Sequence, residues 1–301
     1  DGDSGVYKCN ESFMQEINNS YVNLYPSVIW YKNDSTKHSL KGRFFQVHNT
    51  NNTGQDNFDD MYYAEYNFYK GFPSKSLNWT NGLCANYNES VAEIYGDMKH
   101  FGSSLGFFSQ ADKKFNRLCV SLGARIEGYR IDDDEMKFKP VFRSGVNYAV
   151  SEQSFLRASF GMGYRYPTIA ERYTATSTGD LKVFPNPDLQ PETGYSSELA
   201  FKQGFRLWGW NGYADLAAFY TRYQNMIEFM FNYHNPDSVV LVPYPPTSPN
   251  YFLNWVGFKA ENVRNAEISG FEFVVTGEGK FIGLPATLLL GYTYNNPIDL
   301  D

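Results

Sequence analysis

Long runs in which apolar and polar residues alternate constrain the fold of this chain more than any other feature. In residues 154–166, one face carries Leu156, Ala158, Phe160, Met162 and Tyr164. The other face carries Arg157, Ser159, Gly161, Gly163 and Arg165. A period of two residues is typical of a β-strand and not of a helix. Because segments 116–131, 137–150 and 285–295 repeat the pattern, we predict an all-β, antiparallel fold.

We predict about twelve strands from these patterns. Their ranges are 26–33, 37–50, 57–71, 75–88, 99–111, 116–131, 136–150, 153–166, 194–205, 209–224, 262–277 and 285–295. Residues 1–25 are compatible with either a strand or a loop. Most of these segments are longer than the usual five or six residues of strands in soluble sheets.

The connections between the predicted strands alternate in length. Short ones cover 34–36, 72–74, 112–115, 151–152, 206–208 and 278–284; the intervening ones, 51–55, 89–98, 132–135, 167–193 and 225–261, are longer. Tight turns at one end and large loops at the other are typical of an up-and-down transmembrane β-barrel. A soluble sandwich would also give alternating faces, but with shorter strands and no alternation of loop lengths.

Two motifs stand at the ends of the long connection 167–193. The strand before it ends in GYRYPTIAE (163–171), and NPDLQPET (186–193) precedes the next strand, which carries Glu198. This pair resembles the mid-barrel region of TonB-dependent outer-membrane receptors. The residues that carry the motifs are Pro167, Asn186, Pro187, Leu189, Pro191 and Glu192.

The resemblance implies a twenty-two-stranded barrel in the bacterial outer membrane, of which this chain is expected to hold a part. It also implies an N-terminal plug domain and a TonB-contacting segment as partners, and neither is visible in the sequence. The chain opens on the polar DGDSGVYKCNES without a signal peptide and stops at NNPIDLD without a terminal aromatic strand. The lipid bilayer is the remaining expected partner.

Composition excludes several classes of protein. A net charge of -7 without a basic stripe argues against nucleic-acid binding. No apolar run of about eighteen residues exists, so no transmembrane helix is predicted. The 18% of aromatic residues suits strands and the aromatic girdles of a membrane barrel.

Charged residues on the polar faces are candidates for a barrel lumen, where they would contact a plug and a polar solute. They are Arg125, Glu127, Arg143, Arg157, Glu198, Asp215 and Glu272. On a lipid face, Arg or Lys would cost about 2–4 kcal/mol at the membrane midplane. Simple solvation and cross-strand pairing explain the same residues equally well.

Aromatic and basic residues of the two longest loops are the candidates for ligand binding. They are Tyr164, Arg165, Tyr166, Tyr173, Tyr233, His234, Tyr244, Tyr251 and Trp255. Tyr and Trp combine a rigid apolar surface with a hydrogen-bonding tip, which suits a chelate, corrin or haem. The plain alternative is an aromatic girdle and packing within the loops.

Other chemistry is not supported. The four histidines are scattered without a catalytic arrangement, so no enzyme, metal site or cofactor is predicted. The acidic run 132–135 could bind a divalent cation, but a solvated turn is favoured. Cys9, Cys84 and Cys119 show no CxxC pattern, although a bridge between Cys84 and Cys119 is possible.

Two hypotheses of different classes remain. The first is a receptor that imports a scarce nutrient with TonB-coupled energy, a ferric siderophore or other iron chelate by default, with cobalamin, haem or a glycan as alternatives. The second is a non-transporting surface adhesin or a passive porin. A plug-like domain of about a hundred residues encoded upstream would favour the receptor.

Overall fold

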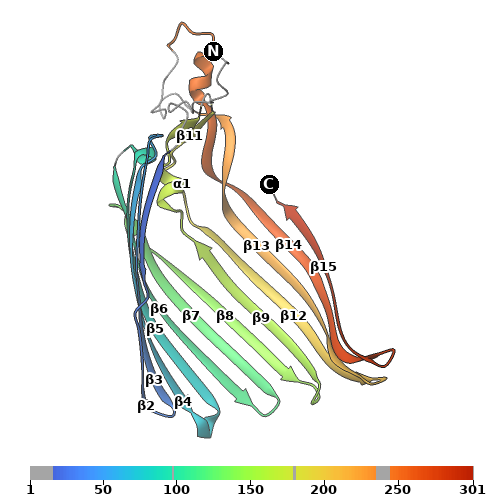
Figure 1. The fold of residues 1–301 in the computed structure, drawn as a ribbon. Coiled ribbons are helices and arrows are strands. Elements are labelled where there is room, and N and C mark those ends of the chain that lie inside the picture. Colours follow the sequence, from blue (N-terminus) through green and yellow to red (C-terminus); the bar gives the residue numbers. More distant parts are fainter. Residues whose placement is uncertain (1–15, 97, 179–180, 235–244, 301) are drawn as a thin grey trace, which may run out of the picture.

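The computed structural model describes residues 16–96, 98–178, 181–234 and 245–300, which form one large sheet (Figure 1). Its strands are β1 (Ile17–Leu24), β2 (Ser27–Asn33), β3 (Thr36–Asn51), β4 (Asn57–Phe72), β5 (Leu77–Ala92), β6 (Lys99–Phe115), β7 (Leu118–Ile131), β8 (Lys137–Ala149), β9 (Ser154–Arg165), β10 (Thr176–Thr178), β11 (Leu181–Phe184), β12 (Glu192–Leu207), β13 (Trp210–Tyr233), β14 (Val256–Phe281) and β15 (Leu284–Asp299).

The helical elements are short. They are α1 (Ile169–Tyr173) and the 3-10 turns η2 (Pro73–Lys75), η3 (Glu93–Tyr95) and η5 (Tyr251–Trp255). Among the described residues, none of the helices has the length and apolarity needed to cross a bilayer.

Neighbours in sequence are neighbours in the sheet. The order is β1-β3-β4-β5-β6-β7-β8-β9-β12-β13-β14, with β2 also on β3 and β15 also on β14. These pairs are antiparallel, whereas β11 joins β14 in parallel. Both β1 and β2 pair with β3, so they form one strand interrupted at Pro26, whose ring removes the N–H needed by a ladder. We call strands β1 to β9 and β12 to β15 the wall. With β1 and β2 counted as one strand, the wall has twelve strands, the number predicted.

The register separates two faces of the wall. We call the face that carries Glu65, Arg125, Arg143, Arg157 and Glu198 the polar face. The opposite face, which we call the apolar face, carries Leu122, Phe142, Phe160, Leu199 and Leu290.

The apolar face is uncovered. Leu122 is 58% exposed, Phe160 39% and Leu290 56%. A sandwich would bury these side chains against a second sheet, and the described strands form only one. The sandwich alternative is therefore wrong, and an apolar face without a protein partner suits a strand wall in lipid.

Short turns lie at one end of the wall and long connections at the other, as predicted (Figure 1). The two-residue turns 116–117, 208–209 and 282–283 contain left-handed backbone, for example Trp208 (φ 50°) followed by Gly209 (φ 80°). The largest difference from the prediction concerns β13 and β14, which extend to Tyr233 and from Val256 instead of ending near 224 and beginning near 262. They rise beyond the end of β12 at the long-loop end (Figure 1).

Candidate functional site

The connection between β9 and β12 folds over the polar face rather than away from the wall. It begins with α1, whose N-terminus has a capping box between Thr168 and Glu171. At the end of α1 the Tyr173 ring stacks on His100 of β6 with centroids 3.7 Å apart. Because His100 pairs with Ser90 in the register of the polar face, the loop crosses β8 and β7 to reach β6.

Arg165 ties both ends of this connection together. Its guanidinium donates to both carboxylate oxygens of Glu171 at 2.8 Å and to those of Glu192 at 2.7 and 2.8 Å. Glu192 also accepts the Ile227 N–H of β13 at 2.7 Å. The planar fork of arginine suits two carboxylates at once, so the last residue of β9 holds α1 and the first residue of β12.

The second motif is a clamp on the β13–β14 hairpin. The Asn186 amide donates to the Ala260 carbonyl at 2.7 Å. Asn262 accepts from Gln190 N–H at 2.8 Å and donates to the Gln190 carbonyl at 2.9 Å. Leu189 is buried between these contacts. The Pro187 carbonyl accepts from Arg172 Nε at 2.7 Å. Together with Pro167 and Pro191, which bracket the connection, these residues fix the path of the loop.

Strands β8 and β9 separate towards the long-loop end. Their pairing stops at Arg143 and Gly161, leaving residues 137–142 and 162–165 without partners across the gap. The Tyr164 hydroxyl reaches the Glu127 carboxylate across it. By register Tyr164 pairs with Thr193 of β12 and alternates with Gly163 and Arg165, as predicted, but its hydroxyl contacts a residue of the polar face through the separation.

Two further tyrosines cover this separation. Tyr166 stacks on Tyr129 with centroids 3.9 Å apart. Its hydroxyl lies 3.3 Å from the Lys137 carbonyl, and Tyr129 donates to the Pro167 carbonyl at 2.8 Å. Burial and the nearby Glu127 charge raise the pKa of Tyr166 to about 12, so Tyr166 is a neutral hydrogen-bond donor at physiological pH.

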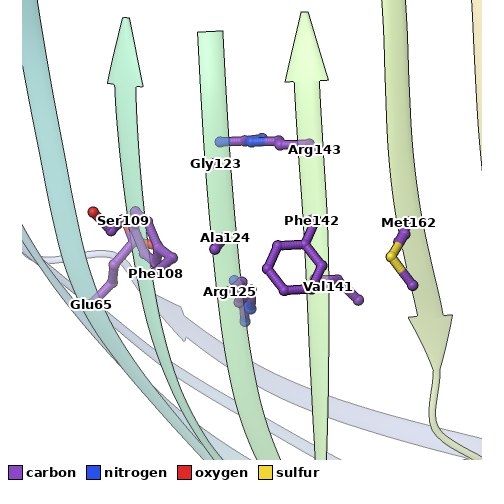
Figure 2. Close-up of a pocket in the computed structure, with 10 residues that line it drawn as sticks. All are labelled: Glu65, Phe108, Ser109, Gly123, Ala124, Arg125, Val141, Phe142, Arg143 and Met162. Carbon is purple, nitrogen blue, oxygen red and sulfur yellow. The ribbon is translucent and has the colours of Figure 1, made fainter.

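A cavity of about 270 Å³ lies below these rings at the separation. Glu65, Arg125 and Arg143 line it from the polar face, and Phe142 and Met162 from the apolar side. Figure 2 shows Met162 on β9 standing apart from Val141 and Phe142 on β8. This cavity is therefore lined from both faces of the wall, at the point where the pairing of β8 with β9 ends.

Side chains of the acidic turn 132–135 are hydrogen-bond and ion-pair partners of neighbouring residues. His100 Nδ1 lies 2.8 Å from Asp132 Oδ2, and the Phe101 N–H donates to Asp132 Oδ1 at 2.8 Å. Arg172, which is buried, donates to Asp134 at 2.7 Å. In the part of the chain that the structure describes, no group of three His, Cys, Asp or Glu residues could hold a metal.

Hydrogen bonding sets the ionisation of this cluster. Burial alone would raise the pKa of Asp132, but hydrogen bonds from His100, the Phe101 N–H and Tyr173 outweigh it and lower the pKa. Burial and the bond to Asp132 raise the pKa of Tyr173 to about 12. The cluster therefore fastens α1 to the β6–β7 end with an ionised carboxylate.

The ligand-binding candidates of the second long loop differ in how far their side chains are buried. His234 is buried, donates its N–H to the Trp255 carbonyl at 2.7 Å and places Nε2 3.2 Å from the Gly257 carbonyl. Trp255 is buried against Tyr251, with ring centroids 5.7 Å apart, whereas Tyr233 is 57% exposed. Tyr244 lies outside the described residues. A binding role for any of these loop residues stays a prediction.

The predicted lumen residues share the polar face by register. Arg125 Nε donates to Glu127 at 2.9 Å, and Arg157 Nη2 lies 3.0 Å from both oxygens of Asp215. Arg143 bonds to Gln110. Glu198 and Glu272 stand opposite Phe219 and Ala217 of β13. The contacts of Arg157 and Arg143 run between strands, whereas the Arg125–Glu127 contact lies within β7. The lumen role of these residues stays a prediction.

Sequence reasoning missed several of the residues that build this end. His100, Arg172 and Asn262 were not singled out, although the TIAE spacing of Thr168 and Glu171 is a readable capping signal. Asn262 lies 72 residues from Gln190, so no local pattern could reveal that contact. Cys84 and Cys119 are both free thiols, so the possible bridge is not formed.

Solved structures of similar shape include a siderophore receptor and a hemophore receptor. The siderophore receptor PirA from Pseudomonas aeruginosa superposes with a TM-score of 0.69 at 13% identity, covering 94% of this chain and 51% of that chain. A double mutant of the Serratia marcescens hemophore receptor HasR, in complex with its hemophore HasA and heme, gives 0.69 at 15%, covering 94% and 49%. These likenesses show the fold.

Sequence comparison agrees. The Hemoglobin and hemoglobin-haptoglobin-binding protein A of Haemophilus influenzae is 31% identical over 121 residues, which are 39% of this chain and 10% of that protein. The chain thus spans a small part of this relative and about half of each solved receptor. Residues 5–301 match the family described as "TonB dependent receptor-like, beta-barrel". With its single open wall, uncovered apolar face and inward-folded loop, this chain belongs to the TonB-dependent receptor family, as a part of the β-barrel.

Proposed function

We propose that this chain forms part of an outer-membrane receptor that binds an iron-bearing nutrient at its long-loop end and imports it with TonB-coupled energy. The observation that carries the proposal is the path of residues 166–178 and 181–191, which fold onto the polar face and are fixed there by Arg165 and Arg172. A loop held over the polar face shapes the opening at the long-loop end of the barrel. A receptor needs an opening shaped to its ligand, whereas a passive pore needs an unobstructed opening.

The charged residues of the polar face are proposed to contact a plug and the passing solute. Tyr233 and Tyr251, with the loop around them, are proposed as ligand contacts, because aromatic side chains give rigid, amphipathic binding surface. Ferric siderophores are the default ligand class, in keeping with the receptor PirA.

Haem is a second candidate with its own support. The Haemophilus influenzae relative is named for binding hemoglobin, and the HasR structure contains heme. Cobalamin and glycans are alternatives for the same fold, without an observation that favours them.

The test is growth of a strain that lacks the gene, with iron supplied only as a ferric siderophore, as haemin or as haemoglobin, and with cobalamin limitation as a separate arm. The proposal predicts loss of growth on at least one iron source and rescue by the full-length gene. Rescue should depend on TonB. Unchanged growth of the deletion strain on every iron source would contradict the proposal.

A further inference from the structure

Two lysines lie on the apolar face of the wall at its short-turn end. Lys70 of β4 stands opposite Trp79 of β5, in the cross-strand row that contains Leu122. Lys113 of β6 stands opposite Leu77 of β5. The two side chains therefore emerge on the apolar face on either side of β5, close to the short turns that join these strands (Figure 1).

Neither lysine has a carboxylate partner among the described residues. Lys70 Nζ donates to Thr36 Oγ1 at 2.8 Å, and Lys113 Nζ donates to the Lys75 carbonyl. Both acceptors are neutral oxygens. The described strands of the wall carry no Asp or Glu on the apolar face in the half that ends at the short turns. Both positive charges therefore lack a counter-charge on this side of the wall.

The other end of the same strands does supply carboxylates. On the apolar face at the long-loop end, Lys99 Nζ lies 2.6 Å from the Glu89 carboxylate. Asp60, on the same face, stands directly opposite Glu89. Opposite charges at neighbouring positions stabilise a strand pair, so the lysines at the short-turn end point to a counter-charge that comes from outside the protein.

The lysine pair is confined to one sector of the wall. At the short-turn end of β8, β9 and β12 to β15, all of which the structure describes, the apolar face carries no Lys or Arg. The side chains there include Tyr148, Leu156, Phe205, Trp210 and Leu284. An aromatic girdle surrounds a barrel of this kind, but cations that only marked the bilayer surface would be spread around the wall.

We propose that Lys70 and Lys113 bind the phosphate of an anionic phospholipid in the leaflet that the short turns face. In barrels of this kind the short turns are periplasmic, so that leaflet is the inner one of the outer membrane. Two strand spacings of about 4.8 Å and one level of side chains of about 6.8 Å place the two Cα atoms roughly 12 Å apart. Both side chains can thus converge on one phosphate above Leu77 and Trp79.

The lysine side chains point towards the depth of the headgroups. Lys70 Nζ lies 6.0 Å from the centroid of the Phe72 ring, and Lys113 Nζ lies 5.2 Å from that of Phe115. Phe72 and Phe115 are the last residues of β4 and β6, so each ammonium group is near the end of its strand. Long cationic side chains at a membrane boundary lay their stems on apolar surface and place their charge at the interface.

The chemistry favours an anionic headgroup over a zwitterionic one. Phosphatidylglycerol carries a phosphodiester and no cation, whereas phosphatidylethanolamine carries an ammonium group that two lysines would repel. Basic residues near a bilayer surface attract anionic lipids. The acyl chains would lie along Leu83 and Leu122, which are exposed nearer the middle of the same face. A lipid therefore gains apolar contacts that inorganic phosphate lacks.

The test measures lipid binding to the full-length receptor in a non-ionic detergent by native mass spectrometry. The probes are phosphatidylglycerol and phosphatidylethanolamine with the same acyl chains, and inorganic phosphate as a competitor. The variant is Lys70→Gln with Lys113→Gln, and Lys70→Arg with Lys113→Arg keeps the charge. The matched control is Lys37→Gln with Lys114→Gln, which removes two charges from the polar face at the same end.

The wild-type receptor is expected to bind phosphatidylglycerol more tightly than phosphatidylethanolamine by about fivefold or more, the factor that one lysine near an anionic surface supplies. The glutamine variant should lose this preference, whereas the arginine variant and the polar-face control should keep it. No preference in the wild type, an unchanged glutamine variant, or equal loss in the control would overturn the proposal. Displacement of the lipid by an equal concentration of inorganic phosphate would assign the lysines to a free anion and also overturn it. None of these results depends on nutrient import, so the proposed function is tested separately.

Discussion

Arg165 holds the β9–β12 connection by two carboxylates, so its removal should loosen that loop without unfolding the wall. In Arg165→Gln, Glu171 and Glu192 lose their shared cation. Unit charges 4 Å apart attract by about 4 kcal/mol at an effective dielectric constant of 20. The Arg165 side chain is 42% exposed and the two carboxylates are 18% and 19% exposed. Removing the Arg165 charge is therefore expected to lower the local stability of the connection by about 2–3 kcal/mol. This value lies between the 0–1 kcal/mol of surface ion pairs and the 3–5 kcal/mol of buried ion pairs.

The assay is hydrogen exchange measured by mass spectrometry on the receptor in lipid nanodiscs. A loss of about 2–3 kcal/mol in local opening free energy predicts exchange about 30- to 150-fold faster in peptides from residues 166–191. Arg157→Gln is the matched control, because the Arg157–Asp215 pair has side-chain exposures of 42% and 19%, as the Arg165–Glu192 pair has. Unchanged exchange in Arg165→Gln, or equal acceleration in both variants, would refute the role of Arg165.

Three further predictions concern the same end and the wall. Hydrogen bonds lower the pKa of Asp132. The contribution of the Asp132 carboxylate to docking of α1 is therefore present above about pH 4 and is lost as the pH falls through the lowered pKa. Hydrogen exchange in α1 should accelerate on acidification, and Asp132→Asn should abolish that dependence. Thr168→Ala removes the capping box of α1 and should cost about 1 kcal/mol of local stability, with Thr168→Ser close to wild type; equal exchange rates in α1 for both would contradict this. Leu122→Arg on the apolar face should lower the free energy of unfolding in lipid vesicles by about 2–4 kcal/mol, whereas Ser121→Arg on the polar face should lower it much less; a reversed order in urea titrations would count against the assignment of faces.

The wall could be predicted from the sequence because its signal is local. Alternation in β7 and β9 and the lengths of the turns fix strand, face and order, since consecutive strands pair. The missed ends of β13 and β14 carried the same signal: Phe229, Phe231 and Tyr233 alternate with Glu228 and Met230. The Pro-rich residues 243–249 in the same stretch favour a loop instead.

The candidate site was less predictable because its contacts are distant in sequence. Five residues of α1 are too few for a hydrophobic period. Arg172 donates to Asp134, which lies 38 residues away in the sequence. Strands β7, β8 and β9 lie in the sequence between His100 and Tyr173, whose rings stack. The resemblance identifies the motif residues, but not their hydrogen-bond partners. Gln190 bonds to Asn262 and Glu192 bonds to Ile227, and both partners come from the β13–β14 hairpin.

In a membrane barrel the apolar face of the wall must meet lipid and the polar face must meet water. A nitroxide scan along residues 118–127 of β7 in lipid bilayers, on a cysteine-free background, tests it directly. We predict a period of two: oxygen relaxes the labels at Leu118, Val120, Leu122, Ala124 and Ile126, and a water-soluble nickel reagent relaxes those at the positions between. Loss of that period, or its opposite phase, would contradict the claim.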